Sequence, residues 1–79
     1  MNKARRILLD KIDDSLIDIK QRLSAVLDDE QTAMDNMPEN LWSSEKYMEM
    51  EDAVEEMTAA IDYIEDAQHK IRGIISDEL

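Results

Sequence analysis

Carboxylates are the most abundant reactive side chains in this chain, so a metal site is the first chemistry to consider. Twenty of the 79 residues are Asp or Glu, whereas there is one histidine, His69, and no cysteine. Di-metal sites in helical bundles combine inward-pointing Glu residues with a Glu-x-x-His pair on one helix. The glutamate nearest to His69 on its upstream side is Glu65, four residues away and not three. We therefore predict no metal site.

Other catalytic patterns are also missing from the sequence. With one glycine in the whole chain there is no glycine-rich phosphate loop, and the acidic stretches lack the glycine of a calcium loop. Covalent catalysis needs a nucleophile beside a base, and none of the five serines has a histidine and an acid at a plausible spacing. We predict that the protein is not an enzyme and needs no cofactor.

Hydrophobic periodicity indicates the elements that position the side chains. Apolar residues recur every three or four positions, as on one face of an α-helix, in two long segments. We call the row of residues on that face the seam of the helix. In the first segment the seam consists of Leu9, Ile12, Leu16, Ile19, Leu23, Val26, Glu30, Ala33 and Met37. The second has it at Tyr47, Met50, Val54, Met57, Ile61, Ile64, Gln68, Ile71 and Ile75. Pro38 lies between them and disfavours helical backbone in the residue before it.

These segments predict an all-α protein made of one helical-hairpin domain over residues 1–79. We expect helix one at about 3–37, a turn at 38–43 and helix two at about 44–77. Ser43 or Ser44 can accept a hydrogen bond from the first free backbone amides of helix two. A connection this short makes the two helices adjacent and antiparallel, with the packing of a coiled coil.

Apolar residues extend beyond the two seams. Helix two has a row of small residues at intervals of seven, and helix one has large apolar residues beside its seam. The residues that we expect at an interface are Leu27, Met34, Ala53, Ala60, Ala67 and Ile74. Alanines can also reflect helix propensity alone, but a lone hairpin of this size buries little area. We therefore expect a homodimer that forms a four-helix bundle.

The chain is acidic, and its charge is unevenly distributed. A net charge of −11 opposes direct binding to nucleic acid or to an anionic membrane. The segment from Asp28 to Glu56 contains eleven acidic residues and one basic residue, a net −10 at the loop end of the hairpin. This end is either a solvated tip, as charge runs usually are, or a surface for a basic protein partner. The candidate contact residues for such a partner are Glu49, Asp52 and Glu56.

Trp42 is an aromatic residue in a turn that would accept a polar one. One interpretation is that it covers the end of the hairpin over Leu41 and Met37. The other is that it is an exposed anchor for a partner.

Two resemblances to known families lie in the turn. The residues from Asn36 to Leu41 (NMPENL), followed by Ser44, Glu45 and Tyr47, resemble the turn of small acidic helical-hairpin proteins of bacterial prophages and mobile elements. That resemblance spans most of the chain and implies a bacterial or phage origin, but no activity. Trp42-Ser43-Ser44 is similar to the turn of secreted Trp-x-Gly hairpins, which are small acidic dimers, although Ser44 replaces the glycine.

The sequence therefore favours a non-catalytic helical interaction or adaptor protein that is homodimeric. Two alternatives are an acidic nucleic-acid mimic that inhibits a basic host protein, and a secreted effector of the Trp-x-Gly type. No apolar run approaches the roughly 20 residues that span a bilayer, and the lack of cysteine fits a reducing compartment. We expect a cytoplasmic location.

Overall fold

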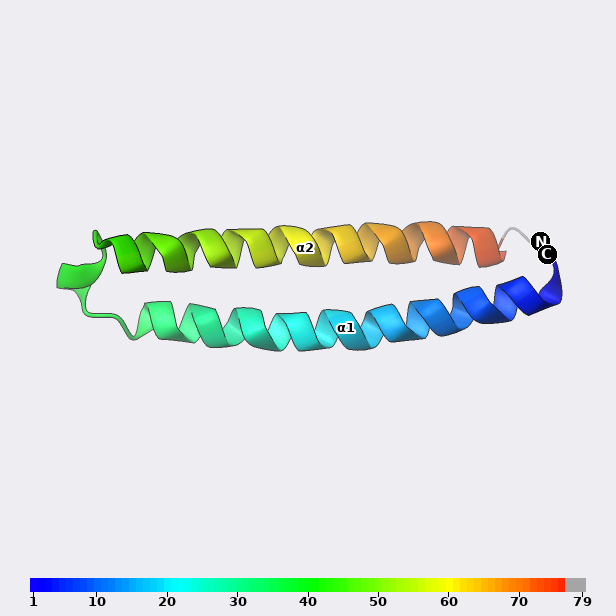
Figure 1. Cartoon of the computed structure of the whole chain (residues 1–79), viewed down its shortest axis with the longest axis horizontal. Coiled ribbons are helices and arrows are strands. Elements are labelled where there is room, and N and C mark those ends of the chain that lie inside the picture. The colour runs from blue at the N-terminus through cyan, green and yellow to red at the C-terminus, as the bar shows by residue number, and fades with distance from the viewer. Residues whose placement is uncertain (77–79) are drawn as a thin grey trace.

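Two long helices and a short turn make up residues 1–76, the part of the chain that the computed structural model describes. Helix α1 covers Lys3–Asp35, the 3-10 helix η1 covers Glu39–Leu41, and helix α2 covers Glu45–Ser76. The two α-helices run antiparallel, side by side along their length (Figure 1). The prediction of an all-α helical hairpin is confirmed.

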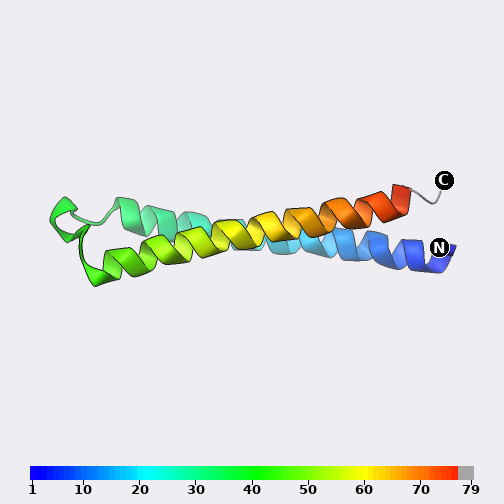
Figure 2. The same ribbon diagram turned by 90° about the horizontal axis from the view of Figure 1, so that it is seen from above.

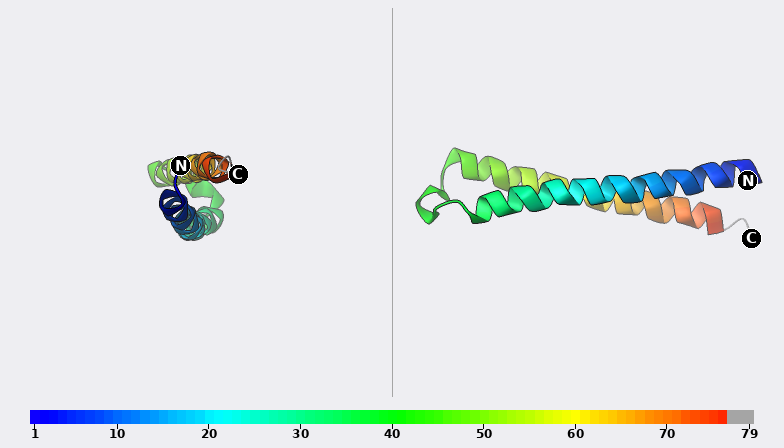
Figure 3. Two further views of the ribbon diagram at one scale, coloured as in Figure 1. Left: turned by 90° about the vertical axis from the view of Figure 1, so that its right-hand side faces the viewer. Right: turned by 90° about the horizontal axis from the view of Figure 1, so that it is seen from below.

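The hairpin is a long, thin molecule. It extends over 59 × 15 × 14 Å with a radius of gyration of 17.8 Å, compared with about 12 Å for a compact chain of this length. The helices cross near their middle when seen from above (Figure 2). Seen from the end, each helix has one helical neighbour and is open on its other sides (Figure 3). A single hairpin therefore covers only one side of each helix.

Local chemistry explains where α1 begins and ends. Asn2 caps the N-terminus, since its Oδ1 accepts a hydrogen bond from the backbone N–H of Arg5 at 2.8 Å. The helix ends at Asp35, two residues earlier than the sequence predicts. The residue before Pro38 is disfavoured in helical backbone, so Asn36 becomes the C-cap.

Ser44 caps the N-terminus of α2, as the sequence predicts for Ser43 or Ser44. Its Oγ accepts a hydrogen bond from the backbone N–H of Tyr47 at 3.2 Å and donates one to the carbonyl of Leu41 at 2.6 Å. One side chain thus satisfies a free amide of α2 and a carbonyl of η1. The other end of this helix was predicted at residue 77, which lies outside the described residues.

The seam predicted for α2 is confirmed. All nine of its positions are buried or half-buried, and Met50 and Gln68 are the most completely covered. Because α1 is the helix that packs against α2, this seam is the surface that α2 presents to α1.

The seam predicted for α1 is half wrong. Leu9, Leu16 and Leu23 are half-buried, as expected, but Ile12, Ile19 and Val26 are exposed. The residue after each of these is covered instead, so that α2 covers Asp13, Lys20 and Leu27. In the same way Met34 is covered in place of the exposed Ala33. Near the loop this orientation buries Leu27 and Met34, which are larger than Val26 and Ala33. Further from the loop it brings two charged residues, Asp13 and Lys20, inward.

No helix within residues 1–76 is both long enough and apolar enough to cross a bilayer.

Candidate functional site

An uncovered apolar row along α1 is the most prominent surface feature of the hairpin. Leu8, Ile12, Ile19 and Val26 have exposed fractions of 57%, 48%, 45% and 55%. The last three are spaced by seven residues and therefore line up on one side of the helix. A continuous row of half-exposed branched residues differs from the scattered apolar residues that any protein surface has.

The residues expected at an interface occupy two different environments. Ala53, Ala60 and Ala67 are half-buried along α2, and Ile74 is 42% exposed. Leu27 and Met34 were expected outside the hairpin's own packing, and this placement is wrong. Met34 is 7% exposed and Leu27 is half-buried, because α1 is rotated about its own axis so that both side chains face α2.

A polar cluster interrupts the hairpin interior at the end away from the loop. Arg72 Nε donates a hydrogen bond to Asp13 Oδ2 at 2.9 Å. Gln68 is 2% exposed. Within residues 1–76, Oδ1 of Asp13 and Nε2 of Gln68 are buried without a hydrogen-bond partner. The Asp13 atom is an acceptor and the Gln68 atom is a donor. Gln68 lies one helical turn before Arg72, the residue that pairs with Asp13.

The acidic segment between Asp28 and Glu56 surrounds the loop end. Ten of its eleven carboxylates are exposed, among them Glu49, Asp52 and Glu56, while Glu30 is half-buried. The ion pairs Arg22–Asp18 and Arg72–Asp13 both lie outside this segment. The segment therefore presents dense negative charge to solvent at one end of a long molecule.

Trp42 makes two contacts that organise the loop. Its Nε1 donates a hydrogen bond to the carbonyl of Met37 at 3.0 Å. Its ring stacks on that of Tyr47, with centroids 6.1 Å apart and an interplanar angle of 25°. Because the side chain is still 47% exposed, these contacts connect the end of α1 to the start of α2 and leave part of the indole accessible.

His69 and Glu65 are exposed residues of α2. Within residues 1–76, no three His, Asp or Glu side chains are placed so that they could hold a metal ion together.

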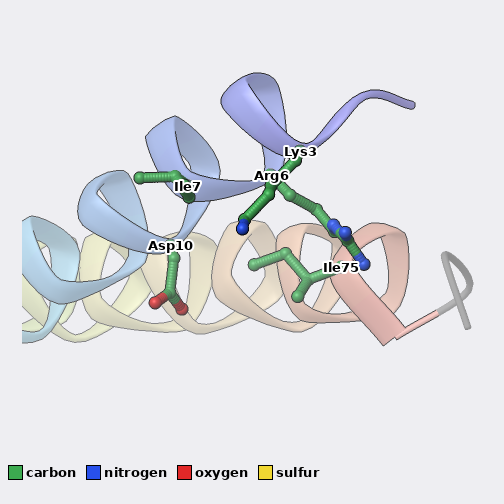
Figure 4. Close-up of a pocket in the computed structure, with 5 residues that line it drawn as sticks. All are labelled: Lys3, Arg6, Ile7, Asp10 and Ile75. Carbon is green, nitrogen blue, oxygen red and sulfur yellow. The ribbon is translucent and has the colours of Figure 1, made fainter.

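A shallow pocket of about 310 Å³ lies near the first turns of α1. Lys3, Arg6, Ile7 and Asp10 line it from α1, and Ile75 lines it from α2 (Figure 4). Small-molecule sites enclose most of a ligand between several elements, whereas here one residue of α2 forms the second wall. The pocket is an open groove lined by two cations, one carboxylate and two isoleucines.

Comparisons with protein-family models, curated proteins and solved structures gave no match to this chain.

The sequence did not indicate the inward position of Asp13. Its partner, Arg72, is 59 residues away in the chain, and no local pattern connects the two. Gln68, in contrast, was visible as a polar residue within the seam of α2.

Proposed function

We propose that this chain is a non-catalytic helical interaction protein whose working unit is a homodimer. The supporting observation is the apolar surface that one hairpin leaves uncovered. Within residues 1–76, Met34 and Met50 are the buried apolar residues. Most of the remaining seam residues are only half-buried, so a partner is needed to complete the core.

The surface area supports the same proposal. The accessible surface is 5960 Å², against about 4,900 Å² for a compact monomer of this mass. The excess of about 1,000 Å² is similar to the roughly 800 Å² that each partner contributes to a stable interface. A second hairpin is a sufficient source of this missing contact area.

Sedimentation equilibrium of the whole chain and of one point variant tests the proposal. Ile19→Glu places a carboxylate at a half-exposed position, where a single hairpin can keep it solvated. In a four-helix bundle the same charge is buried without a partner, at a cost of several kcal/mol. We expect a dimer for the parent at micromolar concentrations and a helical monomer for Ile19→Glu.

Gln21→Glu is the matched control, because Gln21 is an exposed residue of the same helix, on its outer side. This variant should remain dimeric. A parent chain that sediments as a monomer at micromolar concentrations would reject the proposal, as would an Ile19→Glu variant that remains a dimer.

A second candidate function is supported by the acidic end: competition with nucleic acid for a basic protein. Ten exposed carboxylates over residues 28–56 concentrate negative charge at one end of the hairpin, and a basic protein that binds phosphates is attracted by the same sign of charge. Such binding should weaken steeply with salt, since screening reduces the reach of exposed charges to about 8 Å at physiological ionic strength.

Two double variants with equal charge change separate this function from simple solvation. Asp52→Lys with Glu55→Lys changes the acidic end, and Asp62→Lys with Asp66→Lys changes equivalent heptad positions further along α2. All four residues are exposed. We expect the first pair to abolish capture of nucleic-acid-binding proteins from a bacterial lysate and the second to retain it. Equal capture by both would show that the acidic end is only solvated.

A further inference from the structure

The uncovered row of α1 and the alanine row of α2 lie on the same side of the hairpin. Each helix has two flanks beside the surface that meets its neighbour. In α1 one flank carries Ile12, Ile19 and Val26. The other carries Ile17 and Ser24, and Asp13, four residues before Ile17, leans towards it.

In α2 one flank carries the alanine row, and the other carries Thr58, Glu65 and Arg72. Because Arg72 reaches Asp13, the Arg72 flank adjoins the Ile17 flank. The two remaining flanks therefore share the opposite side of the hairpin. We call that side the apolar face; it consists of Ile12, Ile19, Val26, Ala33, Ala53, Ala60, Ala67 and Ile74.

The apolar face is symmetric about its centre. Ile19 is the middle residue of α1, and Ala60 lies at the middle of α2. Ile12 and Val26 lie seven residues on either side of Ile19, and Ala53 and Ala67 lie seven residues on either side of Ala60. A surface that matches itself after a half turn is what an isologous, twofold interface requires.

The charges at the two ends select the direction of that half turn. The loop end carries the net −10 of residues 28–56. At the other end, residues 1–11 have four basic residues and one acidic residue, and residues 69–76 add Lys70 and Arg72. These segments remain positive when Asp77 and Glu78 are counted. Two copies with their loops together would bring two acidic ends into contact, whereas the antiparallel arrangement pairs unlike ends.

We propose that a second copy docks antiparallel on the apolar face, about a twofold axis that passes Ile19 and Ala60. Each Ala60 then meets Ala60 of the second copy, and each Ala53 meets Ala67. Small side chains allow the two α2 helices to approach closely, while Ile12 packs on Val26 between the α1 helices. The axis also brings Glu49 near Lys70 of the other copy, since both residues border the alanine row on its outer side.

Single-cysteine variants test this geometry directly, because the native chain has no cysteine. A disulfide needs Cα atoms within about 7 Å. Under mild oxidation Ala60→Cys should therefore form a covalent dimer with itself. Ala53→Cys should not, although it is half-buried to a similar degree, and it should form one when mixed with Ala67→Cys. Circular dichroism of each variant checks that the helices are retained.

The parallel alternative predicts a different set of bonds. With both loops at one end, α1 of one copy lies over α2 of the other, so Ala60→Cys would cross-link with Ile19→Cys and not with itself. That result would overturn the antiparallel arrangement. As this inference rests on the proposed homodimer, sedimentation separates the two failures: a monomeric parent rejects the dimer itself, whereas a dimer with parallel cross-links rejects only its direction.

A charge exchange gives a second, independent readout. Glu49→Lys and Lys70→Glu should each weaken dimerisation severalfold by placing like charges together, and the double variant should restore it. Single variants that dimerise like the parent, or a double variant that is weaker than both, would contradict the proposed axis.

Discussion

Arg72 and Asp13 form a hydrogen-bonded ion pair in which the nearly buried Asp13 needs its partner and the exposed Arg72 does not. Arg72 Nε donates to Asp13 Oδ2 at 2.9 Å, and the side chain of Arg72 is 54% exposed while that of Asp13 is 11% exposed. The guanidinium can be hydrated without the carboxylate. The carboxylate, in contrast, relies on Arg72. Within residues 1–76 its Oδ2 accepts the hydrogen bond from Arg72, and its Oδ1 has no partner.

Arg72→Ala should consequently destabilise the protein by about 1–2 kcal/mol, because it leaves a nearly buried carboxylate unpaired. Asp13→Leu should be neutral or stabilising, since it replaces that carboxylate by an apolar side chain and releases Arg72 to solvent. Urea denaturation followed by circular dichroism measures both, at one fixed protein concentration because the proposed dimerisation would contribute to stability. A larger loss for Asp13→Leu than for Arg72→Ala would contradict this account.

Gln68→Leu should raise the free energy of unfolding. Gln68 is 2% exposed and its Nε2 has no partner among residues 1–76, and an unpaired buried amide costs about 1–3 kcal/mol. The substitution should also allow more than one helix register or oligomeric state, because a polar seam residue selects one of each. Denaturation measures the first effect and sedimentation the second. Destabilisation would indicate instead that the amide is hydrogen-bonded in solution, with Asp13 Oδ1 as the first acceptor to test.

Ser44→Ala should cost about 1 kcal/mol, the usual effect of removing an N-cap side chain. The Oγ that it removes bonds both the N–H of Tyr47 and the carbonyl of Leu41. Ser43→Ala is the matched control, since Ser43 is exposed and lies one residue before the cap. Thermal unfolding should separate the two variants, and an equal loss in both would show that the turn sequence matters as a whole.

Gly73→Ala should stabilise α2 by roughly 0.5–1 kcal/mol, because glycine is costly inside a helix. A Cβ built at Gly73 meets no atom within 4 Å, so the added methyl group causes no clash. The melting temperature should rise by roughly 3–6 °C. An unchanged melting temperature would mean that this last turn of α2 is already frayed before the hairpin unfolds.

The sequence predicted the helices, the turn and the seam of α2, because these depend on local signals. The three–four spacing, Pro38 and the Ser44 cap each act within a few residues. In α2 the seam is bordered by the polar Thr58, Glu65 and Arg72 on one flank, and this contrast defines its centre.

The orientation of α1 could not be predicted in the same way. Its apolar surface is wide, including both Val26 and Leu27, and both Ala33 and Met34, so the spacing identifies a face without identifying its middle. The position of that middle depends on which side chains α2 accommodates, and on Arg72 meeting Asp13 from across the hairpin. For this reason the sequence analysis placed Leu27 and Met34 on an outer surface. It also placed Ile12 and Ile19 in the seam, whereas they form an exposed row.

Trp42 is the single tryptophan of the chain, and its indole is held by Met37 and Tyr47 at the loop. Its fluorescence therefore reports on one end of the hairpin, whereas far-ultraviolet ellipticity averages over both helices. If the hairpin unzips from the end that contains the polar cluster, ellipticity will fall on heating before the emission maximum shifts to the red. Coincident curves would show that the molecule melts as one cooperative unit. The loop aromatic thus gives the native chain its own fluorophore for measuring how cooperativity extends along a 59 Å molecule.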